Sequence, residues 1–318
     1  MSLIRLHPAL RSAPDAVAVA ALWPAPARVM RSRGVAGAGA IGKAWFRDWL
    51  SRPHRALLLA TLNQHPAWHR LFARDPRYAH CVMSHFIDRR HGVPERFSAM
   101  AVDLQAAAAA FGTRIAERII EREPIRLWSL GPDVHLCLGL NDVSYHEGLW
   151  ALSLRDASGA RLYYLSFCFR AGRELIVPTL QGPGGPGDAA RDTIRRITKD
   201  AEGLRPPALL MAALRTLCAL WGIERLSGIA PEHHVKGRWN LRGTRLRFDY
   251  RGFWQEQGGR PCTSGHWNLP LAPAPRPLQD VPANKRAMYR RRHAMLQVMN
   301  GQIAEAFGVP DPARLAAA

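Results

Sequence analysis

The hydrophobic pattern of the chain changes at Pro124, and this change limits the folds available to it. From Gly42 to Arg122, apolar residues recur at spacings of three and four, which is typical of amphipathic helices. After Pro124, short β-rich runs alternate apolar and polar residues between turn signals, a pattern typical of antiparallel strands. The sequence therefore predicts an α+β protein, with a helical N-terminal region (41–124) followed by a mixed β-sheet flanked by helices (125–318).

Within the second part, the pattern predicts a meander of strands up to "ELIVPTLQ", with the clearest hairpin around the turn at 156–159. Two helices follow, and their ends are marked by Asp188 and Gly203, and by Pro207 and Gly222. Strands are predicted at 225–230 and for "RLRFDYRGFW" at 245–254, and a closing helix at 284–308. In that helix one apolar face is expected, formed by Met288, Met295, Met299, Ile303 and Phe307.

Composition narrows the class of protein. With 318 residues, 47% of them hydrophobic, the chain can bury a large core, which disfavours a disordered or fibrous protein. The formal net charge of +19 favours an anionic partner, such as nucleic acid, acyl carrier protein, a phosphorylated cofactor or anionic lipid. An Arg-rich codon bias explains the excess equally well.

Localisation is suggested by the cysteines and by the apolar runs. The five cysteines are far apart and contain no CxxC pair, so the sequence predicts neither a zinc site nor a disulfide framework. No apolar run is long enough to span a membrane. We expect a basic, flexible leader over residues 1–40, and a cytoplasmic protein or one peripheral at the inner membrane.

A glycine-rich turn, "QGPGGPGD" at 181–188, joins a predicted strand to a predicted helix. Glycines allow the backbone to approach a ligand, and the first N–H groups of the helix would face an anion. The turn lacks the Lys-Ser/Thr of a P-loop. It resembles the pyrophosphate loop of GNAT acyltransferases, although Pro186 stands where that loop has Gly or Ala. The alternative is a tight connector. The donor-binding candidates in the turn are Gln181, Gly182, Gly184, Gly185 and Gly187.

The resemblance extends along most of the chain. The segments "HPAWHRLF", "ITKDAEGLRPPALLMAALRTL", "WGIERLSGI", "FDYRGFWQEQGG", "LPLAP" and "KRAMYRRR" are similar to the VirK/YbjX family of bacterial proteins, over roughly residues 40–310. This resemblance implies a GNAT-like domain behind a helical region, and a link with virulence, envelope behaviour and resistance to cationic peptides.

Candidate catalytic residues lie after one predicted strand and within another. His234 matches the family's histidine after the 225–230 strand and is the candidate base, because imidazole titrates near neutrality. Its neighbour His233 cannot enter the same site if the backbone is extended. Tyr250, beside Asp249, is the candidate acid that protonates a leaving thiolate. The alternatives are surface-loop histidines and an ordinary packed strand.

Cationic residues form two further groups. Lys199 and Arg205 match the family pattern and are candidates to bind a carboxylate or phosphate, or else they interact with a helix C-terminus. The cluster Arg286, Arg290, Arg291 and Arg292 either binds an anionic partner or is solvated. A third group, "LNDVSYHEG" with Asp142, His146 and Glu147, lacks a metal or triad spacing and ranks behind the others.

Two functions remain open from the sequence. The first is acyl transfer from a CoA or carrier-protein thioester to an amine or hydroxyl of a peptide, protein or envelope component, without a metal. No G-x-S-x-G elbow is present, which disfavours an acyl-enzyme. The second is a non-enzymatic basic protein that binds RNA or an anionic membrane surface, although no sequence-specific nucleic-acid motif is present.

Overall fold

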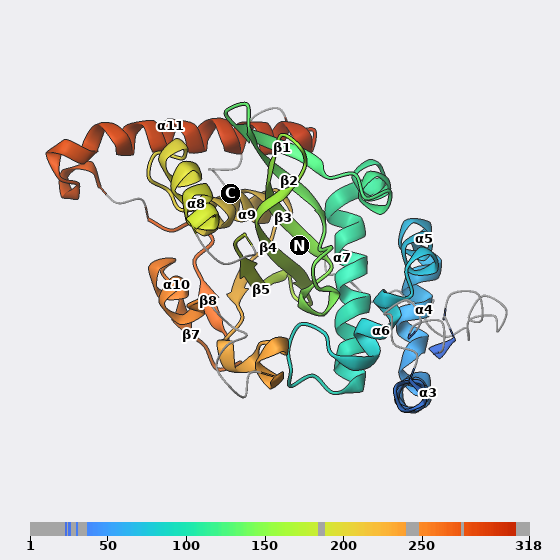
Figure 1. Cartoon of the computed structure of the whole chain (residues 1–318). Helices are drawn as coiled ribbons and strands as arrows, with labels where there is room; N and C mark the ends of the chain where they lie inside the picture. The colour runs from blue at the N-terminus through green and yellow to red at the C-terminus, as the bar shows by residue number, and fades with distance from the viewer. Residues whose placement is uncertain are drawn as a thin grey trace.

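A computed structural model describes residues 23, 25–26, 30, 37–183, 188–239, 248–274 and 277–309 of the chain. Its first half is helical, as predicted (Figure 1). The helices of this part are α3 (Ala38–Ser51), α4 (Arg55–Gln64), α5 (Pro66–Arg74), α6 (Arg77–Ser84) and α7 (Val93–Ile120), with a short 3-10 turn η2 (Arg52–His54). The predicted leader lies almost entirely outside the described residues, but Trp23 and Met30 are both buried.

The second half contains a mixed sheet of eight strands in the order β1-β2-β3-β4-β5-β6-β8-β7. The strands are β1 (Ile125–Leu130), β2 (Val134–Leu140), β3 (Trp150–Asp156), β4 (Arg161–Arg170), β5 (Glu174–Gln181), β6 (Arg225–Gly228), β7 (Arg260–Pro261) and β8 (Trp267–Leu269). All neighbours are antiparallel except β5 and β6, which are parallel. The predicted α+β class, meander and hairpin are therefore confirmed.

The helices of the second half are α8 (Asp188–Asp200), α9 (Pro206–Leu220), α10 (Tyr250–Glu256) and α11 (Ala283–Ala306). Helices α8 and α9 form the crossover between the parallel strands β5 and β6. Helix α11 runs along α9 and β1 (Figure 1). Its predicted apolar face is confirmed toward its C-terminal end, where Met299 and Ile303 are fully buried.

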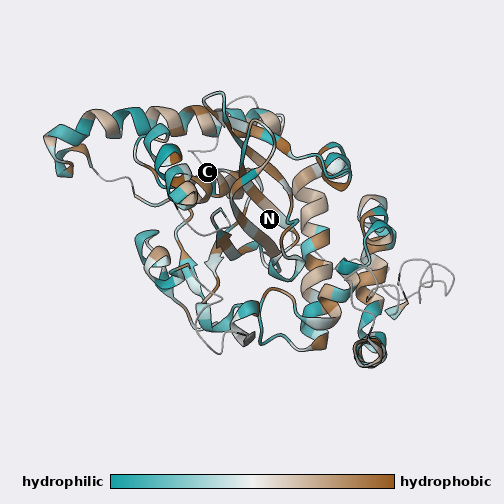
Figure 2. Ribbon diagram, viewed as in Figure 1, coloured by the Kyte–Doolittle hydropathy of each residue, from teal (hydrophilic) through white to brown (hydrophobic). Residues whose placement is uncertain are grey.

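Helices α7 and α9 cover the same face of the sheet. Phe111 of α7 and Trp221, at the end of α9, meet each other over Phe167 and Phe169 of β4, with ring centroids 5.3 to 6.0 Å apart. Figure 2 shows hydrophobic residues concentrated on the central strands, whereas the outer end of α11 is mostly hydrophilic. The opposite face of the β4–β5 pair carries the small polar residues Ser166 and Thr179, because side chains alternate along a strand.

A buried carboxyl connects α7 to the sheet beneath these aromatics. Asp103 is completely buried, and its Oδ1 accepts hydrogen bonds from Trp150 Nε1 (2.9 Å) and from the backbone N–H of Phe169 (2.8 Å). Burial raises the pKa of Asp103 to about 7, although the two donors act in the opposite direction. The carboxyl therefore keeps its proton until near neutral pH.

The predicted strand at 245–254 is wrong for its described part, which forms helix α10. The apolar residues Tyr250, Phe253 and Trp254 follow a spacing of three and four, and all are buried. Asp249 caps the helix by accepting a hydrogen bond from the backbone N–H of Gly252 at 3.0 Å. The alternation of Phe248 with Tyr250 is short, and the cap together with the helical spacing outweighs it.

None of the helices in the described ranges has both the length and the apolar character that crossing a bilayer requires.

Candidate functional site

The site is built around the place where β5 and β6 separate. Their parallel pairing ends at Val177 and Gly228, with a last hydrogen bond from Ile229 N–H to the Val177 carbonyl at 3.0 Å. Beyond this point β5 continues to Gln181 while the chain after β6 turns away into η4 (Pro231–His233). The far end of β5 is therefore paired only with β4.

A β-bulge lies at the same point. Ser166 pairs with Thr179 and Cys168 pairs with Ile176, so two residues of β5, Val177 and Pro178, face a single residue of β4. An extra residue shifts the alternation of the strand by one position. Each later N–H and C=O of β5 therefore points to the side opposite to that expected for a strand without the bulge. As a result, the N–H of Leu180 points away from β4, toward the space that β6 has left.

Tyr250 lies in that space. Its hydroxyl is 2.9 Å from Thr179 Oγ1 and accepts a hydrogen bond from the Leu180 N–H at 3.4 Å. Burial raises the pKa of Tyr250, and the nearby charge of Glu147 raises it further. The phenol is therefore protonated at physiological pH, in a form that can donate a proton.

A group of three ionisable side chains adjoins Tyr250: the buried His234 and Glu147, and the partly exposed Lys236. Nε2 of His234 lies 3.2 Å from Oε1 of Glu147, and Lys236 Nζ lies 2.9 Å from Oε2. The backbone N–H of Lys236 donates to Nδ1 of His234 at 3.1 Å. Because Nδ1 accepts this bond, a neutral imidazole carries its proton on Nε2, facing the carboxylate. The ring centroids of His234 and Tyr250 are 5.5 Å apart.

Glu147 holds the negative charge of this group. Its side chain is fully buried, in the 3-10 turn η3 (Tyr145–Glu147) between β2 and β3. Burial alone would raise the pKa of Glu147, but contacts with His234 and Lys236 outweigh burial and lower it. The Ser166 hydroxyl donates to the Glu147 carbonyl, which fixes the turn on the polar face of β4. A buried carboxylate with a charged partner is the kind of group that marks functional sites.

His233 belongs to a different group. Its ring packs edge-on against His266 at 5.8 Å, and Nε2 of His266 is 3.1 Å from Asp88 Oδ2. Arg90 completes the group with an ion pair to Asp88 at 2.6 Å. Burial lowers the pKa of His233, and the charge of Arg90 acts in the same direction. The two adjacent histidines thus point into separate clusters, in line with the sequence argument that only one can enter a given site.

The glycine-rich turn is only partly described. Gln181 accepts a hydrogen bond from the Tyr164 hydroxyl at 3.1 Å, which connects the start of the turn to β4. Gly182 lies against Tyr163, whose ring carbon Cε2 would be 2.8 Å from an added Cβ. The candidate residues Gly184, Gly185 and Gly187 lie outside the described residues.

Lys199 and Arg205 line one open groove between α8 and α11, with a volume of about 580 Å³. Arg291 of the C-terminal cluster lines it too and pairs with Glu202 at 2.9 Å. Arg205 forms an ion pair with Glu256 of α10, and its charge also acts on Tyr163, beside Gly182. Arg205 therefore lines the groove and lies near Tyr163, whereas Lys199 is near the far end of α8, about 17 Å along the helix from Asp188.

The C-terminal arginines divide by their contacts. Arg292 donates to the Glu202 carbonyl at 2.8 and 2.9 Å, and Arg286 donates to the Val281 carbonyl at 3.0 Å. Arg292 thus stabilises the segment between α8 and α9, and Arg286 stabilises the segment that precedes α11. Arg290 is exposed on the outer half of α11.

The other candidates have structural contacts. Asp249 is the helix cap described above. Asp142 pairs with Arg161 and Arg155, and His146 Nδ1 lies 2.8 Å from the His85 carbonyl. Of the group ranked last from the sequence, Glu147 alone of the three reaches His234.

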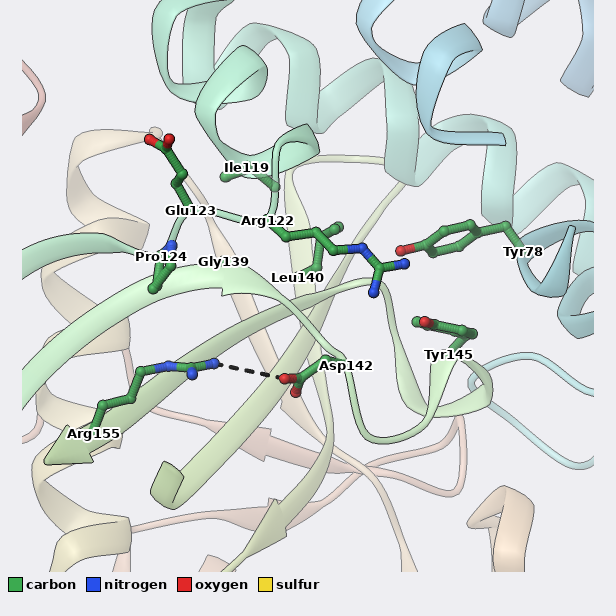
Figure 3. A pocket seen from close by; sticks show the side chains of 10 residues that line it. All are labelled: Tyr78, Ile119, Arg122, Glu123, Pro124, Gly139, Leu140, Asp142, Tyr145 and Arg155. Atoms are coloured by element: carbon green, nitrogen blue, oxygen red, sulfur yellow. Dashed lines mark ion pairs between the residues drawn. The ribbon is translucent and has the colours of Figure 1, made fainter. Parts of the chain in front are cut away.

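A small, partly open hollow of about 90 Å³ lies elsewhere, between the end of α7 and strands β2 and β3 (Figure 3). Arg155 and Asp142 form an ion pair of 3.8 Å across its wall, and Arg122 pairs with Asp75 at 2.9 Å. These charges are already paired within the protein. The hollow is therefore a weaker candidate than the end of β5.

Several residues of the site were not singled out from the sequence: Thr179, Lys236, Asp88 and His266. Thr179 and Lys236 flank predicted candidates, at the end of the β5 run and two residues after His234, so proximity in sequence was a usable signal. Asp88 and His266 come from segments 178 residues apart, and nothing in either segment indicates that they meet. In the described segments, no three His, Cys, Asp or Glu residues are arranged to hold a metal ion.

Comparison with known proteins identifies relatives. Residues 42–305 match the family model DUF535, described as a protein of unknown function. An uncharacterized protein of Haemophilus influenzae is 30% identical over 252 residues, which cover 79% of this chain and 84% of that protein. The membrane protein LapB of Mannheimia haemolytica is 24% identical over 220 residues, covering 67% of this chain and 93% of LapB.

The uncharacterized protein YbjX of Escherichia coli is 27% identical over 166 residues, covering 51% of this chain and 50% of YbjX. No solved structure matches. The family model covers most of the chain, and YbjX is among the relatives, which supports the resemblance noted from the sequence. The chain belongs to the DUF535 family, to which the VirK/YbjX resemblance had pointed.

Proposed function

We propose that the protein transfers an acyl group from a CoA or carrier-protein thioester to an amine or hydroxyl of a peptide, protein or envelope component. The observation that carries the proposal is the separation of the parallel strands β5 and β6, with the Tyr250 hydroxyl placed at the bulged end of β5. The glycine-rich turn that resembles the pyrophosphate loop of GNAT acyltransferases follows β5 and precedes α8. The amides of a pantetheine arm can pair with backbone groups at such a strand end.

The residues then take the following roles. The acceptor nitrogen or oxygen attacks the thioester carbonyl, the C–S bond breaks, and an amide or ester bond forms. The leaving thiolate takes its proton from the Tyr250 hydroxyl, which lies at the bulged end of β5. The proton of the acceptor goes to Nδ1 of His234, and Glu147 stabilises the resulting imidazolium through Nε2.

This assignment requires one local change. Nδ1 of His234 accepts the N–H of Lys236 in the structure, and the histidine side chain is 1% exposed. The acceptor must replace the Lys236 amide at Nδ1 before a proton can move. Gln181 and Gly182, followed by the turn, would then lie next to the phosphates of the donor, with Arg205 as the nearest candidate cation.

Donor binding and transfer test the proposal together. The purified protein is titrated by calorimetry with acetyl-, octanoyl- and palmitoyl-CoA and with an octanoyl carrier protein. Transfer of the labelled acyl group is then followed to lysine-containing peptides and to phosphatidylethanolamine vesicles. We expect Tyr250→Phe to bind the donor but to transfer at least about a hundredfold more slowly, as for loss of a general acid.

Tyr78→Phe is the matched control. Tyr78 is also fully buried, and its hydroxyl has no hydrogen-bond partner. Tyr78→Phe therefore tests the effect of removing a buried tyrosine hydroxyl outside the site. If none of the four donors binds or is consumed, the acyl-transfer proposal is rejected. If Tyr250→Phe transfers as fast as the Tyr78→Phe control, Tyr250 is not the acid.

A second candidate function rests on the groove between α8 and α11. Arg195, Lys199, Arg205 and Arg291 line it together. Three of them pair with carboxylates but remain more than half exposed, so a phosphate-rich partner such as RNA or an anionic membrane can compete for them. Binding of a labelled RNA oligonucleotide should then weaken steeply with salt. Lys199→Gln with Arg291→Gln should reduce this salt dependence, whereas an acyltransferase would keep its selectivity for acyl length as salt rises.

We also propose that the protein works at the cytoplasmic side of the inner membrane. The related LapB is named a membrane protein, and an envelope acceptor would be reached from there.

A further inference from the structure

Helix α3 has the reverse of the usual amphipathic arrangement. The residues it buries are Ala44, Asp48 and Ser51. The residues it exposes are large and apolar, with fractional exposures of 50% for Trp45, 58% for Phe46, 60% for Trp49 and 40% for Leu50. At 3.6 residues per turn these four side chains fall within an arc of about 140°. They form one continuous outward surface, called here the α3 aromatic face.

The inward face of α3 is fixed by polar contacts. The Asp48 carboxylate accepts hydrogen bonds from Trp23 Nε1 at 3.0 Å and from Arg55 at 2.7 Å. The Ser51 hydroxyl donates to the Asp48 carbonyl at 2.8 Å, and the Arg55 guanidinium lies over the Trp23 ring at 4.5 Å. Rotating the helix to bury its aromatic side chains would break this buried network. The outward direction of the aromatic face is therefore imposed by the fold.

This face is unusual for the molecule. The large hydrophobic side chains that are exposed in the described part of the chain are Trp45, Phe46, Trp49, Leu50, Val143, Leu278 and Val298. The first four lie within six consecutive residues, and Phe46 and Trp49 stack with their ring centroids 6.1 Å apart. The other three are on separate elements. Single exposed apolar residues need no explanation, whereas a contiguous patch indicates an interaction surface.

The chemistry of the patch and its rim selects the partner. Tryptophan and phenylalanine prefer the boundary between headgroups and acyl chains, and an interfacial helix presents such residues with basic residues beside them. Lys43 and Arg52 are exposed at opposite edges of the aromatic arc. Arg52 is 3.8 Å from the Asp48 carboxylate but keeps 60% of its side chain exposed, so both can reach lipid phosphates. The formal net charge of +19 adds attraction to an anionic surface.

We propose that the α3 aromatic face is an interfacial anchor that places the protein on the surface of an anionic lipid bilayer. The leader is a weaker occupant, because its described residue Trp23 docks on the opposite, Asp48-bearing side of α3. In a second copy of this chain, the same face would carry Lys43 and Arg52 and bring like charges together. The α3 face is far from the acyl-transfer site around β5 (Figure 1), and the proposal is independent of the function assigned to that site.

Vesicle binding tests the anchor. The full-length protein is sedimented with vesicles of phosphatidylcholine alone and of phosphatidylcholine mixed with phosphatidylglycerol, at low and physiological salt. We expect binding to the anionic vesicles, with at least about a tenfold loss of affinity for Trp45→Ser combined with Trp49→Ser, because affinity scales with buried apolar area. Lys43→Glu should weaken binding to the anionic vesicles and leave the weaker binding to neutral vesicles unchanged.

The matched control is Leu278→Ser combined with Val298→Ser, which removes two exposed apolar side chains from other elements. Circular dichroism and thermal unfolding confirm that each variant is folded, which we expect because the substituted side chains are at least half exposed in α3. The proposal is overturned if the wild type does not bind anionic vesicles, or if the Trp45 and Trp49 variant binds as well as the control. A change of oligomeric state on substitution, with no lipid binding, would assign the face to a second copy instead.

Discussion

Replacing Asp103 by asparagine should remove one identifiable part of the pH dependence of stability. Asparagine has nearly the same shape, and its carbonyl oxygen can accept the hydrogen bonds that Trp150 and Phe169 donate to Oδ1. The other carboxyl oxygen, Oδ2, is buried without a hydrogen-bond partner. The side-chain NH₂ would take its place. The substitution therefore removes a titratable group while keeping the contacts that connect α7 to the sheet.

The magnitude follows from the pKa values. The folded pKa of Asp103 is about 7, against an ordinary value of 3.8. A folded pKa above the unfolded one gives stability that is complete below pH 3.8 and is lost as pH rises toward 7. This difference of about three pH units corresponds to about 4 kcal/mol in the free energy of unfolding, of which roughly 2–3 kcal/mol is lost between pH 5 and pH 8.

The assay is urea unfolding of the wild type and of Asp103→Asn at several values between pH 5 and pH 8. We expect the variant to gain roughly 2–3 kcal/mol relative to the wild type across this range. All other groups titrate alike in both proteins, so the difference isolates Asp103. Asp133→Asn, at an exposed turn between β1 and β2, controls for the general effect of the exchange. A constant difference between Asp103→Asn and the wild type at every pH would refute the reasoning.

Two further predictions concern the site. Glu147→Gln should destabilise the protein at neutral pH by roughly 1–3 kcal/mol, since His234 and Lys236 lose their buried charged partner. Because the pKa of Glu147 is lowered in the fold, its contribution to stability is present above pH 4.5 and disappears as the pH falls through the folded pKa. The stabilities of the wild type and Glu147→Gln should therefore converge in acid. Urea unfolding from neutral pH down to pH 3, with exposed Glu123→Gln as control, measures this, and a difference in stability that stays constant with pH would contradict it. Gly228→Ala should cost roughly 1–3 kcal/mol, because the new Cβ would lie 2.5 Å from Cε2 of the fully buried Trp254 at the end of β6. Thermal unfolding against Gly39→Ala, where nothing lies within 4 Å of the added Cβ, checks it, and equal melting temperatures would show that Trp254 can move.

Much of the fold could be predicted because long periodic runs dominate it. The helical spacing before Pro124 and the strand alternation after it are local signals, and both are confirmed. The strand predicted at 245–254 failed over its described residues, 248–254, where a short apolar alternation competed with the Asp249 cap and with the spacing of Tyr250, Phe253 and Trp254. A seven-residue helix gives too few turns for the period to be clear.

The candidate site was predictable only where its members lie after or within predicted strands. His234 was selected because it follows the strand predicted at 225–230, and Tyr250 because it lay within the strand predicted at 245–254; the structure brings them together. Their partner Glu147 ranked low because its contacts with His234 and Lys236 are made across 87 and 89 residues of sequence, as a result of how the sheet closes. Register effects are equally non-local, since the β5 bulge depends on which residue of β4 faces Val177 and Pro178.

The divergence of His233 and His234 has a consequence for the chain as a whole. His233 lies toward Asp88 and His266, while His234 contacts Glu147. The backbone of the segment 86–89 also bonds to both histidines. Asp88 forms a β-bridge with His234, and the Arg89 N–H donates to the His233 carbonyl at 2.9 Å. The helical region therefore supplies groups that the sheet region needs. A fragment beginning after Pro124 would leave the buried ring of His266 without Asp88, whose carboxylate lies 3.1 Å from its Nε2. The change of sequence pattern at Pro124 therefore does not separate two independently folding domains. The helical region and the sheet region should unfold as one cooperative unit.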